Sequence, residues 1–361
     1  MQLGAILPDR HLPERWSPIS ISATILRQAY GSQAGVGVET DAHRLHRSGF
    51  GHLIITRKML RFRLWVLWLA ALLACSAAAA DDTTRWTMLM VTHKADIADC
   101  HLLELPGGIK VLIDAGKLGD SPGAALAQLK AKNIRSIDLV IISHFHIDHY
   151  GALLELVENG IAIKRVAVNV PDKASADHEK PWGCDLDHVH ATLASLQAHH
   201  IPYFTPKIGD RLMEIKTAKG DVVALDVVCL YDGRNSPVGP TDVNDTSMIV
   251  RLSHGQTRAL FTGDLNNALG AWLAKSEFDL KADILKAPHH GTEGAAPDEF
   301  FDRVGAKAVL VPAPKSLWFS ARSMRIRNYF LEHKIPAYVS GVNGNVTVTL
   351  TAEGYKVETE R

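Results

Sequence analysis

From residue 85 onward, short apolar runs alternate with stretches that carry an apolar residue every three or four positions. The apolar runs predict buried strands, and the periodic stretches predict helices that cover a sheet. The expected strands are 86–91, 101–105, 111–113, 139–142, 166–170, 222–229, 248–252, 259–262 and 308–311. The expected helices are 123–132, 152–158, 187–199, 266–275 and 322–333. The alternation predicts an α/β fold in one domain over residues 85–358, because neither an internal repeat nor a low-complexity linker interrupts it.

Glycine and proline punctuate this outline at two places. Pro106-Gly107-Gly108 lies between two expected strands and is typical of a hairpin turn. Near the end, the apolar runs 337–340, 345–350 and 354–357 are separated by Gly344 and Gly354. These runs predict a small terminal set of strands.

Composition excludes several classes of protein. Hydrophobic residues make up 47% and charged residues 22%, as in an ordinary globular domain. The only strongly apolar stretch, 64–74, is too short to span a bilayer, which excludes a multi-span membrane protein. Residues 1–80 carry 9 Lys/Arg and 4 Asp/Glu, whereas residues 81–361 carry 30 and 35, a net of −5. A mildly acidic body argues against a large basic groove for nucleic acid, but permits a nuclease that holds one phosphate with metal ions.

The beginning of the chain has the layout of a secretory signal. Residues 59–63 are basic, 64–74 are apolar, and an A-x-A site ends at Ala80. We expect a signal peptide over 59–80 and a mature chain in the periplasm or outside the cell, without an integral membrane segment. The sequence before Cys75 also resembles a lipobox, so the alternative is an outer-membrane lipoprotein anchored at Cys75. Residues 1–58 lack a sustained period and are expected to be a non-native or disordered extension.

Three cysteines remain after removal of such a signal: Cys100, Cys184 and Cys229. An odd number in an oxidising compartment allows one bridged pair or three buried thiols. Their spacing matches no C-x-x-C metal site. The sequence leaves their disulfide state open.

The candidate chemistry is concentrated in Ser143-His144-Phe145-His146-Ile147-Asp148-His149-Tyr150-Gly151, directly after the expected strand 139–142. His144 and His146 alternate on an extended segment, so their side chains point the same way. Asp148 and His149 follow round the turn, and a helix is expected to begin at Gly151. Imidazoles beside a carboxylate suit zinc, with manganese or iron as alternatives.

The pattern H-x-H-x-D-H resembles the signature of the metallo-β-lactamase fold, a superfamily of mostly hydrolytic enzymes with two metal ions. Three further motifs follow the family order: V-L-I-D-A-G ending near Asp114, L-F-T-G-D ending at Asp264, and A-P-H-H-G with His289 and His290. The resemblance implies a four-layer αβ/βα sandwich and two divalent metal ions. The implied ligands are His144, His146, Asp148, His149, Asp264 and one of the pair His289 and His290. Asp114 would orient a metal-bound histidine from outside the ligand set.

Residues 281–292 and 335–349 narrow the resemblance to the hydrolase domain of the competence protein ComEC, over residues 88–352. ComEC's membrane-spanning parts have no counterpart here, which implies a stand-alone exported relative. The family's usual third histidine, before the bridging Asp264, is absent. The resemblance leaves Asn244, Asp245 or water as a weaker oxygen ligand for the His144/His146 site. Residues 95–100 and 315–323 also depart from the ComEC pattern, so its substrate contacts do not transfer.

The resemblance implies hydrolysis by a metal-bound hydroxide, with Asp264 bridging both metals and Asp148 binding metal and accepting the proton. A phosphodiester is the favoured substrate, with DNA and cell-wall or lipid phosphodiesters among the candidates. Small-molecule lactones, thioesters and β-lactams are alternatives, although the common zinc β-lactamases have cysteine where this chain has Asp264. An iron-binding oxidoreductase and a metal-binding protein without turnover are the other classes. The remaining histidines are expected to be solvated or capping: 178, 188, 190, 199 and 200.

Overall fold

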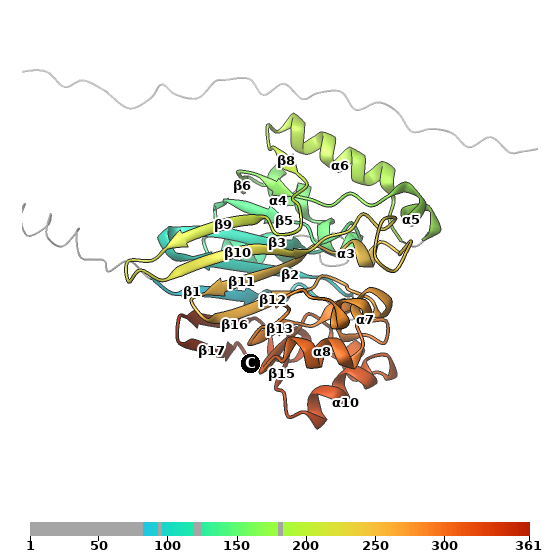
Figure 1. Cartoon of the computed structure of the whole chain (residues 1–361). Coiled ribbons are helices and arrows are strands. Elements are labelled where there is room, and N and C mark those ends of the chain that lie inside the picture. The colour runs from blue at the N-terminus through green and yellow to red at the C-terminus, as the bar shows by residue number, and fades with distance from the viewer. Residues whose placement is uncertain (1–81, 93–95, 118–123, 180–182) are drawn as a thin grey trace, which may run out of the picture. The chain divides into compact units, whose positions relative to one another are not determined.

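The computed structural model describes residues 82–92, 96–117, 124–179 and 183–361 (Figure 1). The expected extension, the signal segment 59–80 and Cys75 lie outside the described residues. Over the described ranges, no helix is both long enough and apolar enough to cross a membrane.

Two large mixed β-sheets form the centre of the fold, with a small two-stranded sheet beside them. The eight-stranded sheet has the order β17-β16-β1-β2-β3-β5-β7-β8, with bounds β1 Thr84–Met88, β2 Cys100–Leu105, β3 Ile109–Ala115, β5 Leu139–Ile141, β7 Val166–Ala167, β8 Tyr203–Phe204, β16 Val346–Thr351 and β17 Gly354–Thr359. The seven-stranded sheet has the order β15-β14-β13-β12-β11-β10-β9, with bounds β9 Arg211–Lys216, β10 Val222–Cys229, β11 Ile249–His254, β12 Thr257–Phe261, β13 Ile284–Lys286, β14 Ala308–Val311 and β15 Ala337–Val339. The small sheet pairs β4 Ser136–Ile137 with β6 Ala162–Ile163.

Helices cover the outer face of each large sheet (Figure 1). The α-helices are α2 Ala124–Ala131, α3 Ile147–Tyr150, α4 Leu153–Glu158, α5 Lys173–His178, α6 Leu186–Ala198, α7 Asn267–Lys275, α8 Asp298–Val304, α9 Lys315–Trp318, α10 Met324–Glu332 and α11 Ser340–Asn343. Short 3-10 helices are η1 Pro106–Gly108, η2 Asn244–Thr246, η3 Pro288–Gly291 and η4 Ala321–Ser323. In Figure 1, α4 and α6 lie on one outer side, whereas α7, α8 and α10 lie on the other.

The alternation of side chains along the strands creates three apolar layers. Leu112 of β3 packs with α2, α4 and α6, whereas its neighbours Val111 and Ile113 pack between the two sheets. In the other sheet, Leu260 of β12 packs with α7, α8 and α10, whereas Phe261 faces the layer between the sheets. Successive strand residues point to opposite faces, so one strand contributes to two layers. Burial of each such side chain stabilises the fold by roughly 1.5–3 kcal/mol. The helices outside the two sheets and the apolar layer between the sheets confirm the predicted four-layer sandwich.

Most predicted elements are present with shifted ends, and the turn Pro106–Gly108 joins the antiparallel strands β2 and β3 as expected. Two expectations are wrong. The terminal strands are not one set: β15 pairs with β14 in the seven-stranded sheet, whereas β16 pairs with β1 in the other. α11 carries the chain between the two sheets. The helix expected from Gly151 begins two residues later, as α4 at Leu153, and a separate one-turn helix, α3, already begins at Ile147 inside the histidine cluster.

The topology brings distant motifs to one edge of the sandwich. β3 and β5 are parallel neighbours in one sheet, and β12 and β13 are parallel neighbours in the other. Asp114 lies at the end of β3, and the segments that follow the other three strands contain the histidine cluster, Asp264 and the His289-His290 pair. Because parallel strands end at the same edge of a sheet, these four segments meet there.

Candidate metal centre

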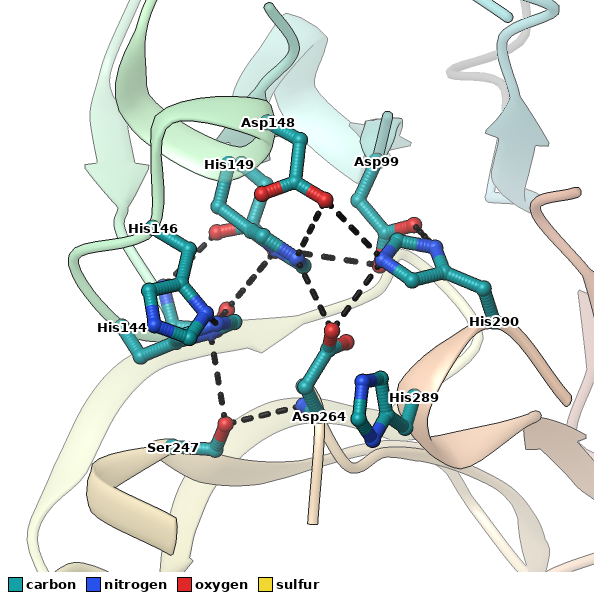
Figure 2. Close-up of polar contacts among 12 residues, drawn as sticks. Asp99, His144, His146, Asp148, His149, Ser247, Asp264, His289 and His290 are labelled. Atoms are coloured by element: carbon teal, nitrogen blue, oxygen red, sulfur yellow. Dashed lines mark hydrogen bonds and ion pairs between the residues drawn. The ribbon is translucent and has the colours of Figure 1, made fainter. Parts of the chain in front are cut away.

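The loop after β5 and the short helix α3 position the H-x-H-x-D-H side chains. Nε2 of His144 lies 3.2 Å from Nδ1 of His146, so the two rings converge as their alternation predicts. Asp148 and His149 occupy α3, whose single turn directs both side chains toward the opposite sheet (Figure 2). His144 and His149 are fully buried, and Asp148 is partly accessible.

Asp114 anchors this loop from the end of β3. Its carboxylate accepts hydrogen bonds from the backbone N–H of Ser143 at 2.7 Å and from the Ser143 hydroxyl at 2.8 Å. The same carboxylate lies 2.8 Å from Nδ1 of His149. A proton on Nδ1 leaves Nε2 of His149 as the free ligand atom, the arrangement found for metal-binding histidines. Asp114 has a φ of 59°, a left-handed conformation that Asp and Asn adopt more readily than other side chains.

Four side chains from both sheets converge into one ligand cluster: Asp148, His149, Asp264 and His290, with ligand atoms within 4.8 Å of one another (Figure 2). Oδ2 of Asp264 lies 3.3 Å from Nε2 of His149 and 3.1 Å from Nε2 of His290. Both Nε2 atoms are buried, yet neither has a partner with hydrogen-bond geometry among the described residues. Buried nitrogens that face carboxylates without hydrogen-bonding them fit a divalent cation. The donor set therefore suits the metal that the motif predicts.

The structure distinguishes the two adjacent histidines. His290 is buried, and its Nε2 lies 3.2 Å from Oδ2 of Asp148 inside the cluster. His289 instead directs Nδ1 to Oδ1 of Asn266 at 2.9 Å. Both residues have positive φ in η3, 47° and 53°, so the backbone turns sharply and separates the two rings. This geometry favours His290 over His289 as the ligand.

The His144/His146 pair has polar neighbours that the sequence analysis did not single out. Nε2 of His146 lies 2.7 Å from Oε2 of Glu179, at the C-terminal end of α5. Ser247 lies 3.4 Å from Nδ1 of His144, and its hydroxyl accepts a hydrogen bond from the backbone N–H of Asp264. Glu179 therefore orients His146 and leaves its Nδ1 facing His144.

The two candidate oxygen ligands of this pair differ in their surroundings. The carboxylate of Asp245 accepts a hydrogen bond from the backbone N–H of Asn266. Oδ1 of Asn244 is buried and has no hydrogen-bond partner in the described ranges. Asn244 also lines the same cavity as His146 and Asp148. The orphaned oxygen makes Asn244 the better candidate of the two. Burial and the nearby Asp242 carboxylate raise the pKa of Asp245 to about 7.

Neighbouring charges shift the pKa values of the residues in the cluster. Burial opposes a charge on His290, but the carboxylates of Asp264 and Asp99 outweigh it and hold its pKa well above the usual value. Burial likewise opposes ionisation of Asp264, but His290, His149 and Lys286 hold the pKa of its carboxyl well below the usual range. His144 differs, because burial and the neighbouring His149 and His146 lower its pKa. A neutral imidazole is the form that binds metal.

Two further buried ionic residues adjoin the cluster without having been predicted. Asp99 precedes β2 and lies 3.0 Å from Nδ1 of His290. Lys286, the last residue of β13, lies 2.5 Å from Oδ2 of Asp99 and 3.3 Å from Oδ1 of Asp264. Residues 95–100 depart from the ComEC pattern, but nothing in the sequence around Asp99 indicates that its side chain faces His290.

A cavity of about 1180 Å³ opens beside the centre. Its wall includes His146, Asp148 and Glu179, so it adjoins the ligand residues. The other charged or titratable lining residues are Asp172, His178, Arg234 and Asp242. The size and position suit a substrate cleft.

Two of the histidines expected to be solvated or capping lie on α6 or at its end. His188 on α6 contacts the hydroxyl of Tyr150 at 2.8 Å. His199 contacts the backbone carbonyl of Ser195 near the end of α6. Cys100, Cys184 and Cys229 are free and buried, the second of the two alternatives that the sequence left open.

The chain matches a known protein family and a curated relative. Residues 93–312 match the family model described as the metallo-beta-lactamase superfamily. ComE operon protein 3 of Bacillus subtilis (strain 168) is 23% identical over 218 residues, which are 60% of this chain and 25% of the relative. The chain thus spans about a quarter of that relative's length.

Two solved structures also resemble the chain. The metallo-beta-lactamase fold protein YhfI from Bacillus subtilis is 12% identical, with a TM-score of 0.46, over 74% of this chain and 100% of that one. Unliganded yeast PDE1 is 11% identical, with a TM-score of 0.43, over 74% of this chain and 99% of that one. The family model covers more than half of the sequence, so the chain belongs to the metallo-β-lactamase superfamily.

Proposed function

We propose that the protein is an exported, metal-dependent phosphodiesterase. The observation that carries the proposal is the convergence of Asp148, His149, Asp264 and His290 beside a cavity of about 1180 Å³. Two divalent ions, zinc first with manganese or iron as alternatives, would be held by this cluster and by the His144/His146 pair. Bound there, they supply Lewis acidity and activate water at neutral pH.

The chain's own residues have separate tasks in this proposal. Asp264 faces the His149 and His290 rings, and its carboxylate would help to hold both metals. Asp148 reaches the cavity wall, so its carboxylate is placed to bind metal and to accept a proton at the cleft. Asp114 and Glu179 fix the orientation of His149 and His146.

Two features support a phosphodiester over a β-lactam. The ligand set contains two carboxylates, Asp148 and Asp264, and it has Asp264 where the common zinc β-lactamases have cysteine, a softer ligand. Arg234 also lines the cavity and offers positive charge to a phosphate group, and the His178 ring offers a further polar contact there. A nucleic acid would be engaged at one phosphate, because the acidic body does not provide a broad basic groove.

The test is turnover of bis-(p-nitrophenyl) phosphate by the metal-loaded protein, with metal content measured on the same sample. A lactone, a thioester and a chromogenic β-lactam serve as competing substrates. Asp264→Asn keeps the side-chain size but loses the negative charge, so it should abolish hydrolysis and reduce bound metal. His188→Ala, on the solvated face of α6, should leave turnover within a few-fold. Normal phosphodiesterase activity in Asp264→Asn with full metal content would refute the proposal.

The export part of the proposal rests on residues 59–80. A basic start, an apolar segment and an A-x-A site ending at Ala80 support cleavage before Asp81. We propose a periplasmic or secreted enzyme, with a lipoprotein anchored at Cys75 as the alternative. The relevant measurement is the N-terminal mass of the exported protein.

A further inference from the structure

A lysine is buried under the metal centre, where an apolar residue would ordinarily end a strand. Lys286 is the last residue of β13, and its side chain is 1% exposed. Its ammonium group lies 2.5 Å from Oδ2 of Asp99 and 3.3 Å from Oδ1 of Asp264, and it donates to the backbone carbonyl of Gly263 at 2.8 Å. Burying a charged pair costs several kcal/mol per ion before the pair is formed, so packing alone does not account for a lysine here.

The partner of this lysine also touches a metal-ligand candidate. Oδ1 of Asp99 lies 3.0 Å from Nδ1 of His290, and Asp99 is fully buried. Nδ1 of His290 lies 3.0 Å from the backbone carbonyl of Pro312 as well, so this nitrogen is held on the side away from the ligand cluster. Nε2 of the same ring faces Asp148 and Asp264.

Two buried carboxylates lie behind the ligand cluster. Asp99 and Asp114 each have an oxygen within 4.8 Å of a ring nitrogen of the buried His149. Two such carboxylates attract a cation, and the ammonium group of Lys286 lies against Asp99. Burial opposes that charge, but the carboxylates of Asp99 and Asp264 outweigh it and raise the pKa of Lys286.

We propose that Lys286 and Asp99 are positioning residues of the metal centre and act as a fixed internal cation–carboxylate pair. Lys286 holds Oδ1 of Asp264, which leaves Oδ2 as the oxygen directed at His149 and His290. Asp99 places its carboxylate 3.0 Å from Nδ1 of His290, which is hydrogen-bonded to the Pro312 carbonyl, and both contacts leave Nε2 as the ligand atom. The inference rests on the proposed metal centre, but not on the identity of the substrate.

The test compares Lys286→Met, Asp99→Asn and the double variant in the full chain, with zinc and manganese as the probes. Met keeps the unbranched shape without charge, and Asn keeps the size of Asp99. Metal affinity is measured by competition with a chelator, and folding by thermal unfolding of the metal-free proteins. Lys307→Met is the matched control, because Lys307 forms an exposed ion pair with Asp283 beside β14, in the same sheet.

Loss of one partner leaves an uncompensated buried charge, so Lys286→Met should unfold at a lower temperature. The double variant removes both charges, and it should recover most of the wild-type unfolding temperature while its metal affinity stays about 10–100-fold weaker, as for other residues that orient ligands. Asp99→Asn should weaken metal binding in the same range, and Lys307→Met should not change it.

A double variant that binds metal within about three-fold of wild type would reduce the pair to a structural ion pair and overturn the proposal. A metal-free double variant that does not fold would also overturn it, because the pair would then be a requirement of the fold. Failure of the phosphodiesterase proposal is distinguishable, since it would appear as absent turnover in a wild-type protein whose metal affinity still depends on Lys286 and Asp99.

Discussion

The most informative single change is Asp114→Asn, because it alters hydrogen-bond chemistry while keeping shape. Asp114 has a φ of 59°, and asparagine adopts this left-handed conformation as readily as aspartate, so the backbone strain is not increased. The amide oxygen can still accept from the backbone N–H of Ser143, which now donates to Oδ1 at 2.7 Å. The amide NH₂ then replaces Oδ2, which lies 2.8 Å from Nδ1 of His149.

The magnitude follows from the contacts of Oδ2, which lies 2.8 Å from Nδ1 of His149 and also accepts a hydrogen bond from the Ser143 hydroxyl. Loss of a hydrogen bond to a charged group costs about 1.5–3 kcal/mol, which should lower the unfolding temperature of a domain of this size by about 3–5 °C. The effect of Asp114→Asn on metal affinity should be larger than its effect on stability. An NH₂ group beside Nδ1 favours the tautomer in which His149 carries its proton on Nε2, the atom that faces Asp264. We therefore expect metal affinity to fall about 10–100-fold.

The assay pairs a thermal melt with chelator competition on the same preparation. Asp138→Asn is the matched control: Asp138 accepts a hydrogen bond from the backbone N–H of Lys110 and pairs with Lys164, outside the ligand cluster. It should lose some stability and no metal affinity. If Asp114→Asn retained wild-type metal affinity, the assignment of Asp114 as the residue that sets the His149 tautomer would be wrong.

Four further predictions concern metal binding and export. Glu179→Gln should weaken metal retention at the His144/His146 site more than at the other site, because Glu179 lies 2.7 Å from Nε2 of His146; metal stoichiometry during chelator titration measures this. In the wild-type protein the same chelator titration should show two separable metal losses, because the cluster of Asp148, His149, Asp264 and His290 offers four convergent donors to one site. Simultaneous release of both metals would contradict this difference between the sites. Restoring metal to 1,000 times its dissociation constant should stabilise the metal-free protein by about 4 kcal/mol in a thermal melt. The exported chain should begin near Asp81, or at Cys75 if lipidated, and an intact Met1 in its mass spectrum would contradict export.

The sequence predicted the layered fold well, because the patterns that indicate strands and helices lie within short stretches of the chain. The apolar runs of β10 and β14 and the periodic stretches of α6 and α7 each carry their own pattern. Strand pairing is not local, so the placement of β15 and β16 in different sheets could not be read from adjacent runs. β13 was missed because it has only three residues and ends in Lys286.

The candidate site likewise combines residues that the sequence identifies with residues that only the fold brings together. The H-x-H-x-D-H motif and Asp264 are marked by residue type and spacing, and the structure brings Asp148, His149 and Asp264 together. Glu179, Asp99 and Lys286 carry no such mark, since each is an ordinary charged residue until the fold buries it. The choice between His289 and His290 depended on two positive φ angles in η3, which residue identity alone does not fix.

Three of the candidate histidine ligands have a carboxylate behind them. Asp114, which the sequence analysis identified, lies behind His149, and Glu179 and Asp99, which it did not identify, lie behind His146 and His290. These three carboxylates come from segments near β3, α5 and β2, so the ligand orientations are determined by tertiary packing. A ligand that is held before metal arrives loses less conformational freedom on binding, which favours tighter binding. The residues behind the ligands should therefore control metal affinity, whereas residues lining the cavity alone, such as Arg234, should control the choice of substrate.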